Sequence, residues 1–359
     1  MPKRLHPLIS IFLLFSMSAM AAGNSYVGAQ VCGSCHPAQF SGQSRSGHAH
    51  ALHRATEHPL AASFTPAAAL ERPPNFHFRF VRMPQGIQVQ ADDSKYLIKL
   101  PADWAFGAGV HAVTFVGKAS DQLYIEHSFT YYADSASFDL TPKHDTLPAK
   151  DLHQAMGQAI NMQGSGVTIQ ACFQCHSTGP VSISAGHEIQ VNETGVRCEV
   201  CHGPGSAHVS AAGAGDLIQA GKAIQNPKNL AAGELNQLCG KCHRFPDGKV
   251  NWADPWNVRH QPGYFQESRC FQKSRGALSC LTCHNPHEPL RRNEASYYRQ
   301  ICLSCHTRSA PEPKPICKTK ESSDCTACHM PAVAANAHLP FRNHWIGVYA
   351  EGAPLKPQP

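Results

Sequence analysis

Residues 172–176 of this 359-residue chain read CFQCH, and residues 198–202 read CEVCH. The same Cys-x-x-Cys-His spacing occurs five more times, so 14 of the 16 cysteines belong to seven copies of one pentapeptide. Two thiols separated by two residues and followed at once by an imidazole have the spacing that attaches a c-type haem. The seven motifs are Cys32/Cys35/His36, Cys172/Cys175/His176, Cys198/Cys201/His202, Cys239/Cys242/His243, Cys280/Cys283/His284, Cys302/Cys305/His306 and Cys325/Cys328/His329.

Each motif predicts one covalently bound haem c, with two thioethers holding one haem edge and the adjacent histidine as the proximal iron ligand. A zinc knuckle or a thioredoxin-like redox pair explains one isolated copy, but not seven copies in one chain. We therefore expect seven haem c groups, each containing iron.

The first residues predict export. Lys3 and Arg4 precede an apolar run over residues 8–20, which is followed by the small residue Ala21. We interpret residues 1–21 as a signal peptide and expect a periplasmic or extracellular protein. No later stretch approaches the roughly 20 apolar residues that a membrane-spanning helix needs, so we do not expect the chain to span a membrane.

The motifs are unevenly spread, which predicts the division of the chain. The alternation of NFHFRFVR at 75–82 and the strand-like run LYIEHSFTYY at 123–132 predict antiparallel strands between the first and second motifs. The expected parts are a first haem-binding segment at 22–64, a β-rich insert at 65–165, a hexahaem cytochrome domain at 166–346 and a flexible tail at 347–359.

The last six motifs leave little polypeptide for each haem. They occupy about 158 residues, roughly 26 for each haem, which is too few to build an adequate apolar core. The porphyrins themselves must therefore form this core. The expected fold class is a mainly α and irregular, haem-packed multihaem cytochrome c with an inserted small antiparallel β module.

The sixth iron ligand separates electron transfer from catalysis, because a second histidine closes the iron. After the seven motif histidines and His6 are set aside, 15 of the 23 histidines remain, more than seven haems require. Few methionines follow the signal peptide. We therefore expect most haems to have two histidine ligands.

Several segments resemble the multihaem family that links the tetrahaem cytochrome of ammonia oxidation, hydroxylamine oxidoreductase and pentahaem nitrite reductase. They are YVGAQVCGSCH, GVRCEVCHGPGSAHV, LTCHNPHEPL, and CTACHMP followed by FRNHWI. The resemblance covers residues 26–58 and 170–345. It implies distal ligands, often to a haem other than the nearest in sequence, at His48 (or His50), His208, His287 and His344.

Other histidines are candidates on local pattern alone. His111 in FGAGVHA is the fifth distal candidate, because its flanking glycines would let a haem approach the backbone. His77 and His127 lie in strand patterns, where a surface or core imidazole is the simpler reading. The remaining candidates are His187 and His260, and behind them His53, His153 and His338.

Two cysteines, Cys270 and Cys317, lie outside the motifs. In an oxidising compartment they most simply form a disulfide, although a free thiol or an unusual iron ligand is the alternative.

The formal charge of +6 does not indicate a nucleic-acid partner. Loss of the signal peptide and the addition of haem propionates bring the holoprotein to about −3, and a whole-chain charge without a clustered basic patch is weak evidence. The expected partners are periplasmic or membrane-associated redox proteins, with a possible complex through the β insert.

Electron transfer is the function that the motifs favour. The alternative is an oxidoreductase that acts on a small nitrogen or sulfur compound at one open haem. Against the usual nitrite reductase, the chain contains no Cys-x-x-Cys-Lys motif.

Overall fold

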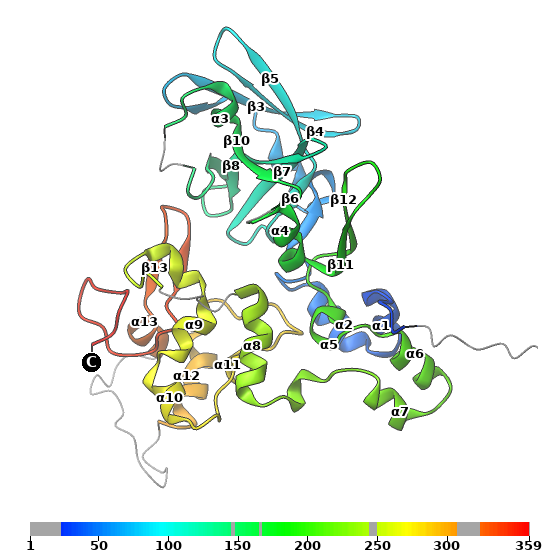
Figure 1. Cartoon of the computed structure of the whole chain (residues 1–359). Coiled ribbons are helices and arrows are strands. Elements are labelled where there is room, and N and C mark those ends of the chain that lie inside the picture. Colours follow the sequence, from blue (N-terminus) through cyan, green and yellow to red (C-terminus); the bar gives the residue numbers. More distant parts are fainter. Residues whose placement is uncertain (1–22, 145–147, 165–166, 244–249, 307–323, 359) are drawn as a thin grey trace, which may run out of the picture.

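The computed structural model describes residues 23–144, 148–164, 167–243, 250–306 and 324–358 (Figure 1). The predicted signal peptide lies outside these residues, and so does Cys317, which leaves the Cys270–Cys317 disulfide a prediction. Strands gather at the top of the view in Figure 1 and short helices occupy the lower half.

The β-rich part contains two antiparallel sheets. A four-stranded sheet has the order β2-β3-β4-β5, and a second sheet has the order β1-β6-β7-β8-β10, with β9 also paired to β8. The strands of the first sheet are β2 (Leu70–Arg72), β3 (Phe76–Met83), β4 (Gly86–Asp92) and β5 (Leu97–Ala102). Those of the second are β1 (Leu52–Arg54), β6 (Trp104–Phe106), β7 (Ala112–Ser120), β8 (Leu123–Tyr132), β9 (Ser137–Leu140) and β10 (Gly157–Asn161).

Strand β3 shows why this part folds as predicted. Phe76, Phe78 and Phe80 alternate along the strand and are all buried, because successive side chains of a strand point to opposite faces. They pack with Phe115 of β7 and other buried residues in one apolar core shared by the two sheets. The aromatic strands thus serve to build this core.

The module begins before residue 65, where we placed its start. Strand β1 lies within the first haem-binding segment and pairs with β6, so that Leu52 is opposite Phe106. The chain from the first motif therefore enters the second sheet directly.

Short helices carry the motifs in the rest of the chain. Three of these helices, α11, α12 and α13, contain no buried residue. A helix of an ordinary apolar core buries one face instead. The motif helices are α1 (Ala29–Cys35), α4 (Ile169–His176), α5 (Cys198–His202), α8 (Ala232–His243), α11 (Cys280–Cys283), α12 (Ala295–Leu303) and α13 (Cys325–His329).

The remaining elements connect and support these helices. The helices are α2 (Pro37–Ser44), α3 (Leu152–Met156), α6 (Ser206–Gly213), α7 (Leu217–Lys222), α9 (Gln261–Gln266) and α10 (Arg269–Lys273). Short 3-10 turns are η1 (Ala55–Glu57), η2 (Ala61–Phe64), η3 (Pro227–Asn229) and η4 (Pro255–Arg259). Two hairpins are β11 (Ser177–Ile183) with β12 (Ile189–Thr194), and β13 (Ala332–Ala334) with β14 (Pro340–Arg342).

The expectation of a mainly α and irregular fold needs correction. Helices, 3-10 turns included, make up 33% of the described residues, and strands make up 25%. The chain is therefore a mixed structure, in which the strands of the two sheets and the small hairpins contribute three quarters as many residues as all helices and 3-10 turns together.

The C-terminal tail, which we expect to be flexible, contacts the helical part at Pro354 and Leu355. Asn343 donates side-chain hydrogen bonds to the carbonyl oxygens of Pro354 and Leu355, at 2.8 and 3.0 Å. Leu355 packs against a cluster that includes the fully buried Val258 and Tyr264. Leu355 therefore provides an apolar contact between the tail and the helical part.

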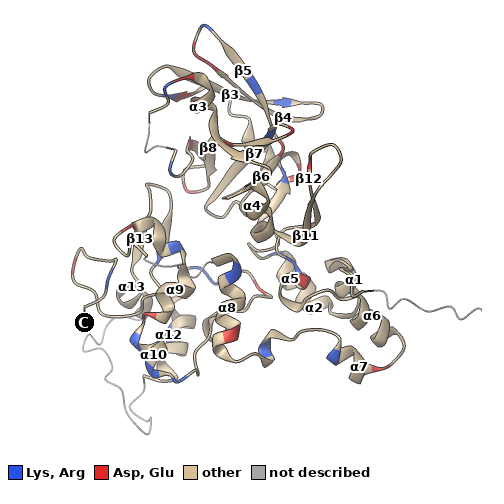
Figure 2. Ribbon diagram, viewed as in Figure 1, with Lys and Arg blue, Asp and Glu red and all other residues tan. Residues whose placement is uncertain are grey.

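Basic and acidic residues are interspersed over both parts of the described chain (Figure 2). Among the described residues, none of the helices has the length and apolar character required to cross a bilayer.

Candidate haem sites

Four motif histidines face a second histidine from elsewhere in the chain. In each case the two ring centroids lie between 6.0 and 6.3 Å apart. The second member is always one of the four histidines at which the family resemblance implies a distal ligand. The pairs are His36 with His208 at 6.2 Å, His243 with His48 at 6.0 Å, His202 with His287 at 6.0 Å and His284 with His344 at 6.3 Å.

This separation fits an iron atom between two imidazoles. With a metal–nitrogen distance of about 2.0 Å and about 1.1 Å from nitrogen to ring centre, two ligands on opposite sides of one metal have centroids roughly 6 Å apart. Directly stacked rings lie closer together, as His50 and His53 do at 5.4 Å. The four pairs therefore have the spacing that a haem with two histidine ligands requires.

Hydrogen bonds orient several of these imidazoles. A ligand histidine usually binds the metal through one nitrogen and donates the other ring N–H to a carbonyl or carboxylate. Here Nδ1 is the nitrogen held by backbone oxygen, which leaves Nε2 available to iron. The bonds run from His176 to Ala51 at 2.9 Å, His202 to Gln225 at 2.8 Å, His208 to Ala220 at 2.8 Å, His329 to Gly347 at 2.8 Å and His344 to Arg342 at 2.9 Å.

Burial favours the neutral form of four of the paired histidines, and the neutral form is the one that binds a metal. Burial lowers the pKa of His48, His243 and His284 below the ordinary histidine value, and neighbouring histidines lower the pKa of His48 and His284 further. Burial lowers the pKa of His344 to about 4. At neutral pH these side chains have a free lone pair for the iron.

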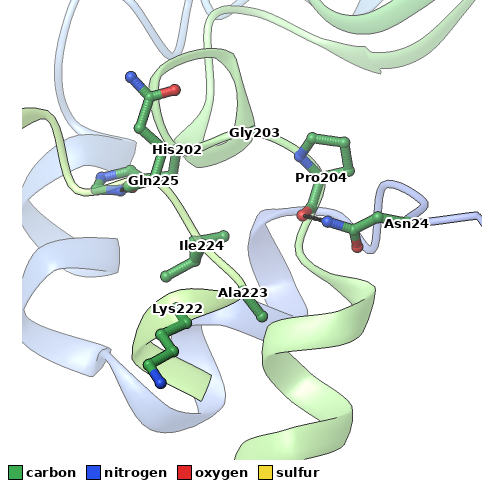
Figure 3. A pocket seen from close by; sticks show the side chains of 8 residues that line it. All are labelled: Asn24, His202, Gly203, Pro204, Lys222, Ala223, Ile224 and Gln225. Atoms are coloured by element: carbon green, nitrogen blue, oxygen red, sulfur yellow. Dashed lines mark hydrogen bonds between the residues drawn. The ribbon is translucent and has the colours of Figure 1, made fainter. Parts of the chain in front are cut away.

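A pocket of about 360 Å³ adjoins His202 (Figure 3). The segment from Lys222 to Gln225 forms one wall of the pocket. Gly203, Pro204 and Asn24 also line the pocket. Gln225 also supplies the carbonyl that holds His202 Nδ1, at 2.8 Å. The wall that shapes the pocket therefore also orients the imidazole of the motif histidine His202.

The structure does not bring His111 together with a motif histidine among the described residues. Its Nε2 lies 2.8 Å from Nη1 of Arg292, so this nitrogen accepts a hydrogen bond from the guanidinium. The alternative candidate His50 stacks on His53, with Nδ1 3.3 Å from Nε2. It is therefore His48 that faces a motif histidine.

Other histidines use their ring nitrogens within the protein. His58 bonds Gly107 O through Nε2 at 3.0 Å and accepts from the amide of Leu60 through Nδ1. His127 is completely buried in the sheet and bonds Pro101 O through Nε2 at 2.8 Å. These two imidazoles stabilise the β module.

The seven motifs adjoin one another through their cysteines. Thiols of different motifs contact each other in four places, and electrostatic contacts of Cys201 with Cys239 and of Cys302 with Cys283 join the remaining neighbours. The motifs thus form one connected series, with the second beside the fourth. The four thiol contacts are Cys32 with Cys198, Cys175 with Cys242, Cys239 with Cys280 and Cys302 with Cys325.

Three motif cysteines lie at the surface of the polypeptide. Cys35, Cys305 and Cys328 are exposed, and each is the second cysteine of its motif. Cys305 follows the exposed Ser304 just after helix α12, and Cys328 lies on helix α13, which buries no residue. Their role remains a prediction from the motif spacing alone.

Sequence reasoning missed the groups that orient the ligands. Backbone carbonyls of Ala51 and Gly347 carry no residue signal, because any residue can supply them.

Comparison with known proteins finds similarity to multihaem cytochromes. The family model described as cytochrome c554 and c-prime matches residues 133–203. "Multiheme cytochrome MtrA" of Shewanella baltica (strain OS185) is 27% identical over 179 residues, which are 45% of this chain and 45% of that protein. The chain thus spans about half the length of this curated relative.

The crystal structure of "Outer Cell Wall Cytochrome OcwA" has a TM-score of 0.50 at 14% identity, covering 89% of this chain and 79% of that one. At this identity the likeness concerns the fold alone.

Proposed function

We propose that the chain is an exported heptahaem c-type cytochrome that transfers electrons. The observation that carries the proposal is the set of four histidine pairs with centroids 6.0–6.3 Å apart. Two histidine ligands close an iron to other molecules, which suits electron transfer and excludes substrate binding at that iron.

The residues of the chain have separable tasks in this proposal. The fourteen motif cysteines hold the seven haems, the motif histidines are their proximal ligands, and His48, His208, His287 and His344 are distal ligands. Haem iron supplies one-electron Fe(III)/Fe(II) chemistry when it is bound. The cysteine contacts between motifs keep neighbouring attachment sites close, which is what rapid passage of electrons along one chain requires.

The partners proposed are periplasmic or membrane-associated redox proteins. The signal peptide at residues 1–21 supports export, and one structural neighbour bears the name of an outer cell wall cytochrome. The more specific relation to hydroxylamine oxidoreductase and pentahaem nitrite reductase is supported by the motif resemblance alone.

Catalysis at an open haem is the second candidate, and a specific observation favours it. Among the described residues, no second histidine ring faces His176, His306 or His329 in the way that the four pairs do. His176 instead packs edge-on against Phe106, with centroids 5.2 Å apart. An iron left open there would bind a small nitrogen or sulfur compound.

A carbon monoxide difference spectrum of the dithionite-reduced holoprotein separates the two candidates, because carbon monoxide binds promptly only at an open iron. Electron transfer through closed haems predicts no spectral change. Binding of about one equivalent per chain would support the catalytic candidate, and nitrite, hydroxylamine and tetrathionate would then be tested as substrates.

A further inference from the structure

Glu199 is a buried carboxylate inside the third motif, between Cys198 and Cys201. Its side chain is 3% exposed. It accepts hydrogen bonds from the backbone amides of Val27, at 2.9 and 3.1 Å to its two oxygens, Gly28 at 2.8 Å and Gly205 at 2.8 Å. Two backbone amides of the N-terminal segment thus donate to this one carboxylate.

These amides satisfy Glu199 without cancelling its charge. An ionised carboxylate is an acceptor only, so the donors match its charged form. Among the described residues no ion pair involves Glu199, and the nearby guanidinium of Arg197 lies 3.6 Å from an oxygen of Glu193 instead. A net negative charge therefore stays in a site that water screens poorly.

The charge lies where two attachment sites meet. The thiol of Cys32, in the first motif, contacts that of Cys198 and lies within the electrostatic field of Glu199. A fixed anion favours Fe(III) over Fe(II), because reduction removes one positive charge from the iron. Net charge near a haem is one of the quantities by which a protein sets the reduction potential.

We propose that Glu199 holds a buried negative charge, and that this charge lowers the reduction potentials of the haems on the first and third motifs. The inference rests on the proposed function, since it requires that both motifs carry haem. For unit charges about 10 Å apart in a protein-like dielectric, the effect on an equilibrium constant is on the order of tenfold.

The test is the substitution E199Q in the holoprotein, which removes the charge and keeps the shape of the side chain. Spectroelectrochemical titration, followed by optical and electron paramagnetic resonance spectra, should show one or two of the seven components shifted to more positive potential. The equilibrium constant for their reduction should rise about tenfold, equivalent to 59 mV for a one-electron couple.

S206A is the matched control, because it loosens the same N-terminal segment without changing charge. The Ser206 hydroxyl accepts from the amide of Ser25 at 2.8 Å and donates to Asn24 Oδ1 at 2.9 Å. Its potentials should equal those of the wild type. Equal shifts in S206A and E199Q, or no shift in E199Q, would overturn the proposal.

R197Q keeps the inference testable if E199Q does not fold. Removing the positive charge beside Glu193 should shift the same components to more negative potential, opposite to E199Q, and a positive shift in R197Q would count against an electrostatic role. A pyridine haemochrome assay on the same samples counts the haems per chain. It therefore tests the proposed function separately from the role of Glu199. Fewer than seven haems in the wild type would refute the proposed function, whereas seven haems with unmoved potentials would refute only the role of Glu199.

Discussion

Replacing His208 with alanine should open one iron of the holoprotein to carbon monoxide. His208 faces His36 with ring centroids 6.2 Å apart, so the two rings leave room for one iron between them and little else. If His208 is the distal ligand that we propose, alanine removes the whole ligand ring and would open that iron. Carbon monoxide uptake by the reduced protein should therefore rise by one equivalent per chain over the wild type.

The fold should survive this change. His208 Nδ1 donates one hydrogen bond to Ala220 O at 2.8 Å, and losing a bond of this kind costs about 1 kcal/mol. H77A is the control, because His77 lies in strand β3 and pairs with Glu71 and Asp92 across the sheet. If H208A takes up no additional carbon monoxide, or if H77A takes up as much, the assignment of His208 as a distal ligand is wrong.

Two further predictions concern the β module. Burial lowers the pKa of His338, but its hydrogen bonds to Asp134 and Asp139 outweigh this and raise it. The imidazolium therefore stabilises the fold fully below the unfolded pKa of about 6.5 and loses this contribution as pH rises through the higher folded value. The deficit in melting temperature of H338N should accordingly be larger at pH 6 than at pH 9, and a deficit independent of pH would contradict it. F115A removes a fully buried ring that packs edge-on against Phe64 at 4.8 Å, and should cost about 3–5 kcal/mol by chemical denaturation while haem content stays unchanged. A loss below 1 kcal/mol would show that this core does not hold the module together.

Much of the haem-binding pattern could be predicted because it is local. A Cys-x-x-Cys-His pentapeptide contains its own chemistry, and the histidines that follow several motifs carried a family resemblance. The structure brings His48, His208, His287 and His344 opposite motif histidines, and their role as ligands remains a prediction.

The partner of each distal histidine could not be predicted. His208 follows the third motif in sequence but faces His36 of the first, because the N-terminal segment folds back onto residues 199–207 through bonds such as Ser25 N to Ser206 Oγ. His111 shows the opposite failure: its glycine-rich surroundings suggested a haem, whereas the structure places Arg292 against its Nε2.

The exposure of individual motif cysteines could not be predicted either. The Cys-x-x-Cys-His spacing is the same in every motif, yet Cys305 and Cys328 are exposed while Cys302 and Cys325 are half-buried and contact each other. Which cysteine of a motif faces a neighbouring motif depends on how the short helices pack, and the spacing within one motif carries no information on that packing.

Strand prediction succeeded where the pattern was long enough to show a period. The alternation of phenylalanines in β3 indicated both a strand and its buried face. Strand β1 has only three residues, too few to show alternation, and its pairing with β6 comes from tertiary contact alone. The boundary of the module was misplaced for this reason.

The central claim is that seven haems work together as one electron carrier, and a reductive titration of the purified full-length holoprotein tests it most directly. Stepwise addition of dithionite under anaerobic conditions, monitored by the haem absorption bands, should consume seven one-electron equivalents per chain. Uptake of clearly fewer than seven electrons by fully loaded protein would contradict the account.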